Sequence, residues 1–236
     1  MTDYTLYYWP VPFRGQFIRA ILAHAGKTWD EPDNVGELTG AAPDQQPAPF
    51  MGPPALIDKA TGFKLSQMSA IALYLGETLD LLPDNAEGRA TTVKIVNDAN
   101  DVIDDITLDG GRKMWTPETW KAYVPRLERW MAIFETSARH GGLTPDSGYL
   151  LKTDQAGVAD IVTATMWGTL GDRFPPIAER LRDHAPLIAG LTQRMMATPR
   201  LSALDEDSRK RFGNTYCGGQ IEASMRKVIN GETTDA

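Results

Sequence analysis

The hydrophobic pattern of the chain changes character once, at residues 81–87. Before this point, short β-branched and aromatic runs alternate with helical stripes, whereas every apolar repeat after it has helical spacing. The segment LLPDNAEG at the change is rich in the residues of linkers. We therefore predict two domains: residues 1–81 with mixed α/β structure, and residues 88–236 entirely helical.

The first domain is expected to run β-α-β and then β-β-α. YTLYYW is an aromatic run ended by Pro10, and QFIRAILAHAG carries an apolar stripe at helical spacing. ALID and FKLS are the next strands, joined by the turn sequence KATG, and SAIALYLGETL is helical. Residues 36–53 have no clear period, so we expect an irregular segment with at most a short helix.

The second domain carries successive helical stripes, which begin with residues 88–108 and 117–138 and continue to about residue 195. From Asp205 onward the chain is charged and contains several glycines. We expect part of this tail, residues 205–236, to be loose.

The charge balance and the apolar runs exclude several kinds of partner. The chain has 24 Lys and Arg against 31 Asp and Glu, a net charge of −7, which disfavours nucleic acid because its binding needs a basic patch. No apolar run approaches the roughly 18 residues that a membrane helix needs. The N-terminus lacks the basic and apolar segments of a signal peptide. We expect no membrane partner and a cytoplasmic location.

Metal-binding patterns are missing from the sequence. One cysteine, Cys217, excludes an internal disulfide and a thiolate metal cluster, and the three histidines are far apart. Asp101, Asp104 and Asp105 are close together on a predicted helix, but a solvated or dimer-facing acidic surface explains them better than a metal site. We expect no metal.

Three places in the first domain are candidates for a ligand site. Tyr8 ends the first strand, Pro53 and Pro54 precede a later strand, and QMSAI opens a helix. In an open sheet, ligands gather beyond strand ends and at helix N-termini, so these elements are expected to converge.

Five segments then point to a family. YTLYYWPVPFRGQFIRAILAHAGKTW, PPALID with LSQMSAIALYLG, KIVNDANDVIDDI, GVADIVTATM and PLIAGLTQRMMATPRL occur in this order over residues 4–204. Together they resemble the tyrosine-type glutathione S-transferases, close to the pi and mu classes, as a divergent member of bacterial style. The resemblance implies a thioredoxin-like domain followed by an all-helical domain, usually in a homodimer.

The resemblance also implies a reaction. Glutathione would be the co-substrate, and its thiolate would attack a small apolar electrophile, as in detoxification. Free thiols have a pKa of about 8.5, so a hydroxyl that donates a hydrogen bond to the sulfur favours the reactive thiolate. Tyr8 matches the family's thiol-activating tyrosine, and Pro54 matches its cis proline.

Further residues match the family's binding positions. Those expected to hold glutathione are Arg14, Pro53, Gln67, Met68, Ser69 and Asp98, the last reaching across the dimer. Those expected beside the electrophile are Trp9, Val11, Phe13, Leu108 and Trp115.

The chain departs from the family at three places that bear on the glutathione site. Met68 stands where the family has a serine hydroxyl, and Ser69 points about 100° away on a helix. Pro53 has no N–H, so one of two main-chain bonds to glutathione is lost. The loop after Tyr8 is two residues longer than in the family, and we expect this to move Arg14. The lost hydroxyl bond alone is worth roughly 1.5–3 kcal/mol.

These departures leave an alternative open: a non-catalytic, dimeric binding or scaffold protein of the same fold, with lost or weak glutathione binding. A glutathione-dependent reductase or ether-cleaving lyase ranks lower, because such enzymes usually have a cysteine or serine in the first loop. Residues 9–16 contain neither.

Overall fold

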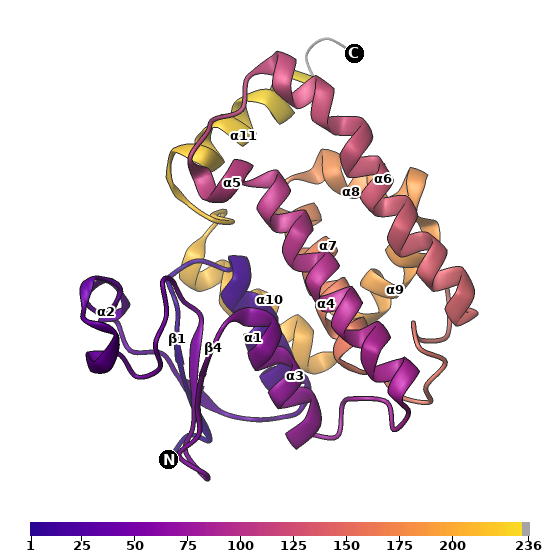
Figure 1. Cartoon of the computed structure of the whole chain (residues 1–236). Coiled ribbons are helices and arrows are strands. Elements are labelled where there is room, and N and C mark those ends of the chain that lie inside the picture. The colour runs from indigo at the N-terminus through magenta and orange to yellow at the C-terminus, as the bar shows by residue number, and fades with distance from the viewer. Residues whose placement is uncertain (233–236) are drawn as a thin grey trace.

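The computed structural model describes residues 1–232, without the side chains of Asp109 and Glu232. A four-stranded sheet with its helices comes first and helices follow to the end of the described chain (Figure 1). The elements are β1 (Tyr4–Tyr7), α1 (Phe13–His24), β2 (Trp29–Asp30), α2 (Val35–Gly40), a 3₁₀ turn (Pro43–Gln45), β3 (Ala55–Asp58), β4 (Lys64–Ser66), α3 (Met68–Thr78), α4 (Ala86–Ile106), α5 (Leu108–Gly111), α6 (Pro117–Gly141), α7 (Val158–Arg173), α8 (Pro175–His184), α9 (Pro186–Met196), α10 (Pro199–Phe212) and α11 (Gly219–Glu232).

The sheet has the strand order β2-β1-β3-β4. β1 is parallel to β2 and antiparallel to β3, with Tyr4 opposite Asp58 and Tyr7 opposite Ala55. β3 and β4 form an antiparallel hairpin whose turn is held by the Asp58 carboxylate, which accepts the N–H groups of Ala60 and Thr61. This mixed sheet, with α1 and α3 against it, is the expected thioredoxin-like arrangement.

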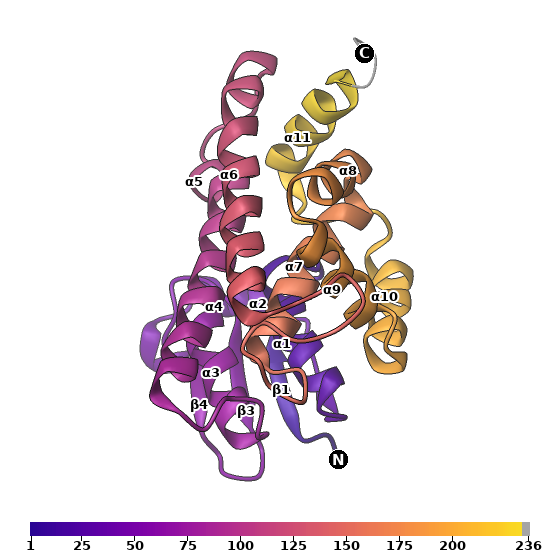
Figure 2. The ribbon, with the colours of Figure 1, turned by 90° about the vertical axis from the view of Figure 1, so that its right-hand side faces the viewer.

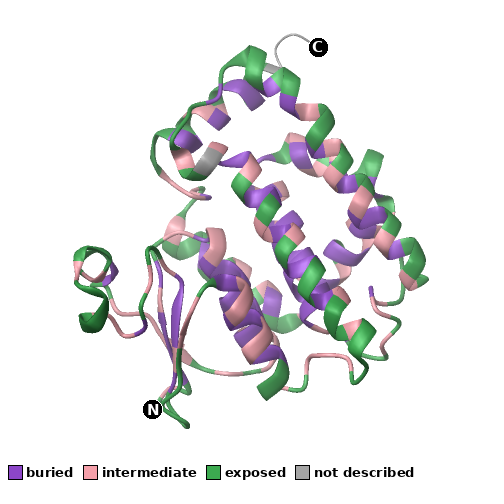
Figure 3. Ribbon diagram, in the orientation of Figure 1, coloured by how far each residue is buried: buried purple, intermediate pink, exposed green. Residues whose placement is uncertain are grey.

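The helical part has a buried central helix. α7 is buried around almost its whole circumference and packs against α1, α4, α8 and α9. α4 and α6 are amphipathic, with buried and exposed residues on opposite faces (Figure 3). One hydrophobic cluster continues from the sheet through α1 and α3 into these helices, so the two parts share a core. The sequence's fold class is confirmed: a thioredoxin-like domain with a C-terminal helical domain.

Local signals explain where the long helices begin and end. The Asn85 side chain accepts the N–H of Gly88 and caps α4. Thr116 and Thr119 form a reciprocal capping box at the start of α6, and Pro117 occupies the first helical position. α6 ends at Gly141 and is followed by Gly142, whose φ of +72° is the left-handed conformation that glycine adopts without strain.

The C-terminal tail is more ordered than the sequence suggested. Two helices, α10 and α11, are separated by a connection at residues 213–218, and α11 lies against α5 and α6 (Figures 1 and 2). Ile221, Met225 and Ile229 supply a buried stripe at spacing of four, and this stripe explains why the segment is helical. Residues 233–236 lie outside the described chain. Among the described helices, none combines the length and the apolar character needed to cross a membrane.

Candidate active site

Tyr8 follows β1 directly and its side chain is buried, with 4% of its surface exposed. The ring lies against the first turn of α1, and the hydroxyl oxygen accepts the main-chain N–H of Arg14 at 2.9 Å. A Cβ atom added at Gly15 would lie 2.2 Å from the Cδ1 atom of Tyr8. Arg14 and Gly15 therefore hold the Tyr8 side chain in place, because the glycine leaves room for the ring and the arginine supplies the N–H.

The environment of Tyr8 keeps its proton in place. Burial raises the pKa of Tyr8 to about 12, although the charges of Arg14 and Arg19 and the Arg14 N–H act in the opposite direction. The phenol is thus un-ionised at neutral pH. Since its oxygen already accepts an N–H, its own O–H remains to be donated to an acceptor such as a sulfur anion.

The tyrosine loop, residues 9–12, leads from Tyr8 into α1, and the Arg14 side chain in the first turn of α1 connects this region to α4. Its Nε donates to Asn100 Oδ1 at 3.1 Å, and its Nη2 forms an ion pair with Asp104. The guanidinium also lies 4.8 Å from the centre of the Phe13 ring. One part of the acidic surface predicted on this helix therefore binds Arg14, while Asp101 is exposed.

The start of α3 is the second candidate element. The Pro53–Pro54 peptide bond is cis, as the resemblance implied, and Pro54 accepts the N–H of Gln67 at 3.2 Å. Gln67 has a φ of +77°, a strained conformation for a residue other than glycine, and such strain often occurs at functional sites. The Met68 side chain is buried in the core, so this position offers a ligand its main-chain N–H. Ser69 is half-buried.

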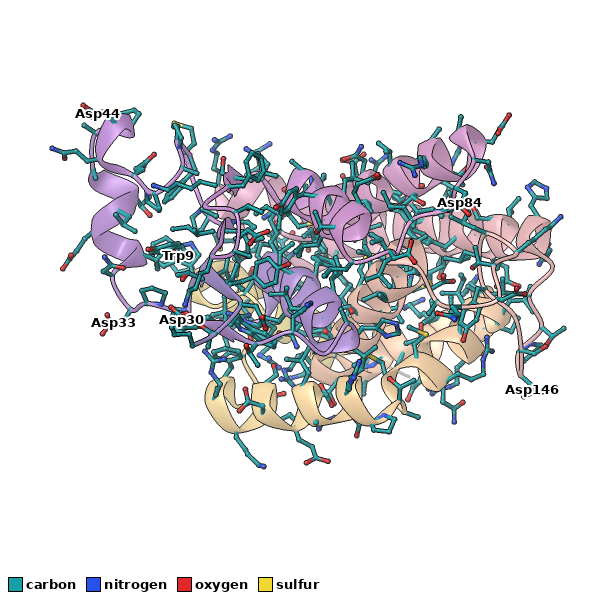
Figure 4. All side chains as sticks on the ribbon, turned by 90° about the horizontal axis from the view of Figure 1, so that it is seen from below. Trp9, Asp30, Asp33, Asp44, Asp84 and Asp146 are labelled. Carbon is teal, nitrogen blue, oxygen red and sulfur yellow. The ribbon has the colours of Figure 1, made fainter. Side chains whose placement is uncertain are left out.

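The residues expected beside the electrophile separate into two groups around the tyrosine loop. Trp9 is 37% exposed and lies beside α2 (Figure 4). Val11 and Phe13 instead face the C-terminal segment: the Phe13 ring meets the Tyr216 ring edge-on, 5.5 Å between centres, and Val11 is beside Gly218.

The two expected residues from the helical part are also separated from each other. Leu108 is half-buried and contributes to a surface hollow with Asp104 and Asp105. Trp115 is only 6% exposed, its Nε1 donates to Ile106 O at 2.8 Å, and its ring packs against those of Trp120 and Tyr123. The structure thus places Trp115 in an aromatic core cluster.

Asp98 lies half-buried on α4, where it forms an ion pair with Lys94 one turn earlier. Within one chain it belongs to the same helix as Asn100 and Asp104, the two partners of Arg14. Among the side chains that the structure describes, no three His, Cys, Asp or Glu groups gather in a way that would hold a metal ion.

Sequence reasoning missed two residues near Tyr8. Arg19 is 1% exposed and its guanidinium lies 5.6 Å from the centre of the Tyr8 ring. Tyr216, from the tail expected to be loose, is buried between the rings of Phe13 and Phe174. Arg19 could have been noticed in the sequence, because it is the charged residue in the apolar stretch FIRAIL.

Comparisons with known proteins agree with this geometry. The family model described as glutathione S-transferase, C-terminal domain, matches residues 91–228, more than half of the chain. No curated protein sequence matches the chain significantly.

Several solved structures share the fold. A Nu-class transferase from Haemonchus contortus is 20% identical with a TM-score of 0.66, and monomeric Na-GST-3, a glutathione S-transferase from the hookworm Necator americanus, is 21% identical with a TM-score of 0.69; each alignment covers 87% of this chain and 97% of the other. A Pi-class transferase from Onchocerca volvulus is 19% identical with a TM-score of 0.68, covering 88% of this chain and 94% of the other. At these identities the likeness concerns the fold alone. The match to the family model covers more than half of the chain, and the mixed sheet followed by a helical domain, with the buried tyrosine after β1, agrees with it. The chain therefore belongs to the glutathione S-transferase family.

Proposed function

We propose that this protein is a tyrosine-type glutathione transferase that joins glutathione to a small apolar electrophile. The proposal rests on the environment of Tyr8. Its oxygen accepts the Arg14 N–H, and burial raises its pKa to about 12, so its O–H remains available to donate a hydrogen bond. A donor held in this way favours a thiolate over a thiol at the same place.

The proposed reaction has two steps. The thiol of glutathione first loses its proton to solvent, and the Tyr8 O–H donates a hydrogen bond to the resulting sulfur anion. The sulfur electron pair then forms a bond to an electrophilic carbon, and the displaced electron pair leaves with a leaving group or goes to a conjugated acceptor that takes up a proton. Tyr8 keeps its own proton throughout, in agreement with its raised pKa.

The proposal assigns the peptide part of glutathione to two elements. The carbonyl of Pro53, the Gln67 residue and the N–H groups of Met68 and Ser69 are grouped around the cis proline and the start of α3. A helix N-terminus favours a carboxylate because its N–H groups are unpaired and its dipole end is positive. We accordingly propose that residues 1–81 are the glutathione-binding domain and that residues 88–236 are the all-helical C-terminal domain.

A homodimer is part of this proposal, since Asp98 would reach glutathione from the partner subunit. Na-GST-3 is described as monomeric, so the family fold alone does not decide the matter. Sedimentation should show a dimer of the 26.0 kDa chain. A single 26.0 kDa species at micromolar concentration would remove the role of Asp98 across an interface.

A second candidate is a non-catalytic binding or scaffold protein of this fold, and three observations favour it. Pro53 lacks an N–H, the Met68 side chain is buried in the core, and the Arg14 guanidinium is already bound to Asn100 and Asp104. Each observation reduces the number of groups that can bind glutathione, while none changes the contacts that hold Tyr8.

Calorimetric titration with glutathione separates the two candidates. The transferase should bind in the micromolar to low-millimolar range and should conjugate an aromatic test electrophile. Tyr8→Phe should retain binding and lose most of the conjugation rate. Tyr7→Phe, on the same strand, is the matched control and should retain both. Absence of binding up to about 10 mM glutathione would reject the transferase in favour of the binding protein.

A further inference from the structure

Arg19 is a buried cation on α1 whose side chain reaches the tyrosine loop. Its Nη1 donates to Val11 O at 2.9 Å and Pro12 O at 3.3 Å, and its Nη2 donates to Trp9 O at 3.4 Å. The residue lies on the part of α1 that is buried on all sides. Three carbonyls of one short loop therefore converge on a single guanidinium, which makes the loop's fold dependent on that group.

The same guanidinium is tied to a carboxylate on its other side. Arg19 binds Glu31 through two bonds, Nε to Oε1 at 2.9 Å and Nη2 to Oε2 at 2.7 Å. The Glu31 side chain is 9% exposed, and it also accepts the indole N–H of Trp29 at 2.8 Å. This paired geometry matches the flat fork of arginine and is not available to a lysine.

The bridge continues into the helical part of the molecule. Arg211 on α10 binds Glu31 through both of its terminal nitrogens, at 3.1 and 3.3 Å. The guanidiniums of Arg19 and Arg211 also lie on the Phe212 ring, at 5.1 and 4.8 Å from its centre. A chain of contacts therefore runs from α10 through Glu31 and Arg19 to the loop that follows Tyr8.

The loop held by Arg19 joins the two partners of the hydrogen bond at the candidate active site. Residues 9–12 connect Tyr8 to the start of α1, where Arg14 donates its N–H to the Tyr8 hydroxyl. If the loop relaxes, the N–H and the hydroxyl separate and the phenol loses its orientation. A misplacement of about 1 Å at a reacting group costs on the order of a hundredfold in rate.

We propose that Arg19, braced by Glu31 and Arg211, is a positioning residue that fixes the direction in which the Tyr8 hydroxyl donates its hydrogen bond. This inference rests on the proposed function for its catalytic consequence, but its structural part stands on the contacts above. Arg19 acts through the loop and does not touch the substrate.

The first test compares Arg19→Lys with wild type in the full-length protein. Lysine keeps the charge and loses the fork, so kcat for conjugation should fall about tenfold or more while KM for glutathione changes less than threefold. The acidic limb of the kcat/KM profile should move to higher pH, by about one unit. A purely structural role would lower Tm and leave this profile in place, which would overturn the proposal.

A second readout does not depend on glutathione. Hydrogen exchange of the Arg14 amide, which is protected by Tyr8, should become at least tenfold faster in Arg19→Lys. Arg200→Lys is the matched control, because Arg200 contacts the other end of α1 by donating to His24 O. Its exchange at Arg14 should equal that of wild type. Equal protection in Arg19→Lys and wild type would overturn the proposal.

A third variant covers a failure of Arg19→Lys to fold. Arg211→Gln alters the half-exposed end of the bridge and should give smaller changes of the same sign in exchange and in the pH profile. No change in either would overturn the bracing role. If wild type binds no glutathione, the proposed function fails, and the exchange experiment still decides whether Arg19 positions Tyr8.

Discussion

Replacing Gly15 with alanine should damage the candidate active site without touching any polar group. The new Cβ would lie 2.2, 2.6 and 2.9 Å from three carbons of the Tyr8 ring, whereas carbon atoms pack at about 3.5–4.0 Å. The ring must therefore retreat by roughly 1 Å. Overpacking of this kind costs about 1–3 kcal/mol, and the displaced hydroxyl should lower kcat/KM by about a hundredfold.

Urea unfolding and conjugation kinetics measure the two effects. Gly40→Ala is the control, because nothing lies within 4 Å of its new Cβ, and it should be neutral or gain up to about 1 kcal/mol. In Tyr8→Ala the clash disappears, so adding Gly15→Ala to it should cost little further stability. If Gly15→Ala shows wild-type stability and kcat/KM, the Tyr8 ring does not lie against α1 and our account of the site is wrong.

Three further predictions concern ionisable groups. Burial alone would raise the pKa of Glu31, but its hydrogen bonds to Arg19 and Arg211 and the charge of Arg19 lower that pKa to about 2. Glu31→Gln should therefore lower the free energy of unfolding by about 3 kcal/mol above pH 4.5, and this loss should shrink as the pH falls through 2. Burial raises the pKa of Asp160 to about 6, so ionisation of this carboxyl destabilises the fold. In unfolding titrations, the free energy of unfolding that Asp160→Ala loses should be about 3 kcal/mol larger below pH 4 than above pH 6. Burial, followed by the Glu222 charge, raises the pKa of Cys217 from 9.0 to about 12, so its alkylation at pH 8 should be about 10³-fold slower in the native than in the unfolded protein, and equal rates would contradict the buried position.

The pattern of the sequence was sufficient for the fold because each signal is local. The aromatic run before Pro10 gives β1, the turn KATG joins β3 to β4, and Pro117 and Gly142 mark the two ends of α6. The C-terminal helix was missed for a local reason as well. The glycines of residues 213–219 interrupt the pattern, and they conceal the apolar spacing that begins at Ile221.

The candidate site was predictable in part. The strand pattern placed Tyr8 at the end of β1, and the resemblance implied the cis proline. The contacts of Arg19 could not be found from the sequence, because its partners are carbonyls of a loop and a glutamate twelve residues away. The position of Trp115 could not be predicted from the sequence either, since an aromatic residue beside a site and one in a core cluster have the same sequence pattern. Packing between distant helices decides between the two.

We propose above all that the Tyr8 hydroxyl stabilises the thiolate of bound glutathione. The most direct test of this claim is a pH titration of the ultraviolet thiolate absorbance of the complex, with wild type, Tyr8→Phe and the Tyr7→Phe control. We predict a thiol pKa about two units below the free value of ~8.5, equivalent to about 2.7 kcal/mol, and a return towards ~8.5 in Tyr8→Phe alone. A glutathione complex whose thiol has the same pKa in wild type and Tyr8→Phe would contradict the claim.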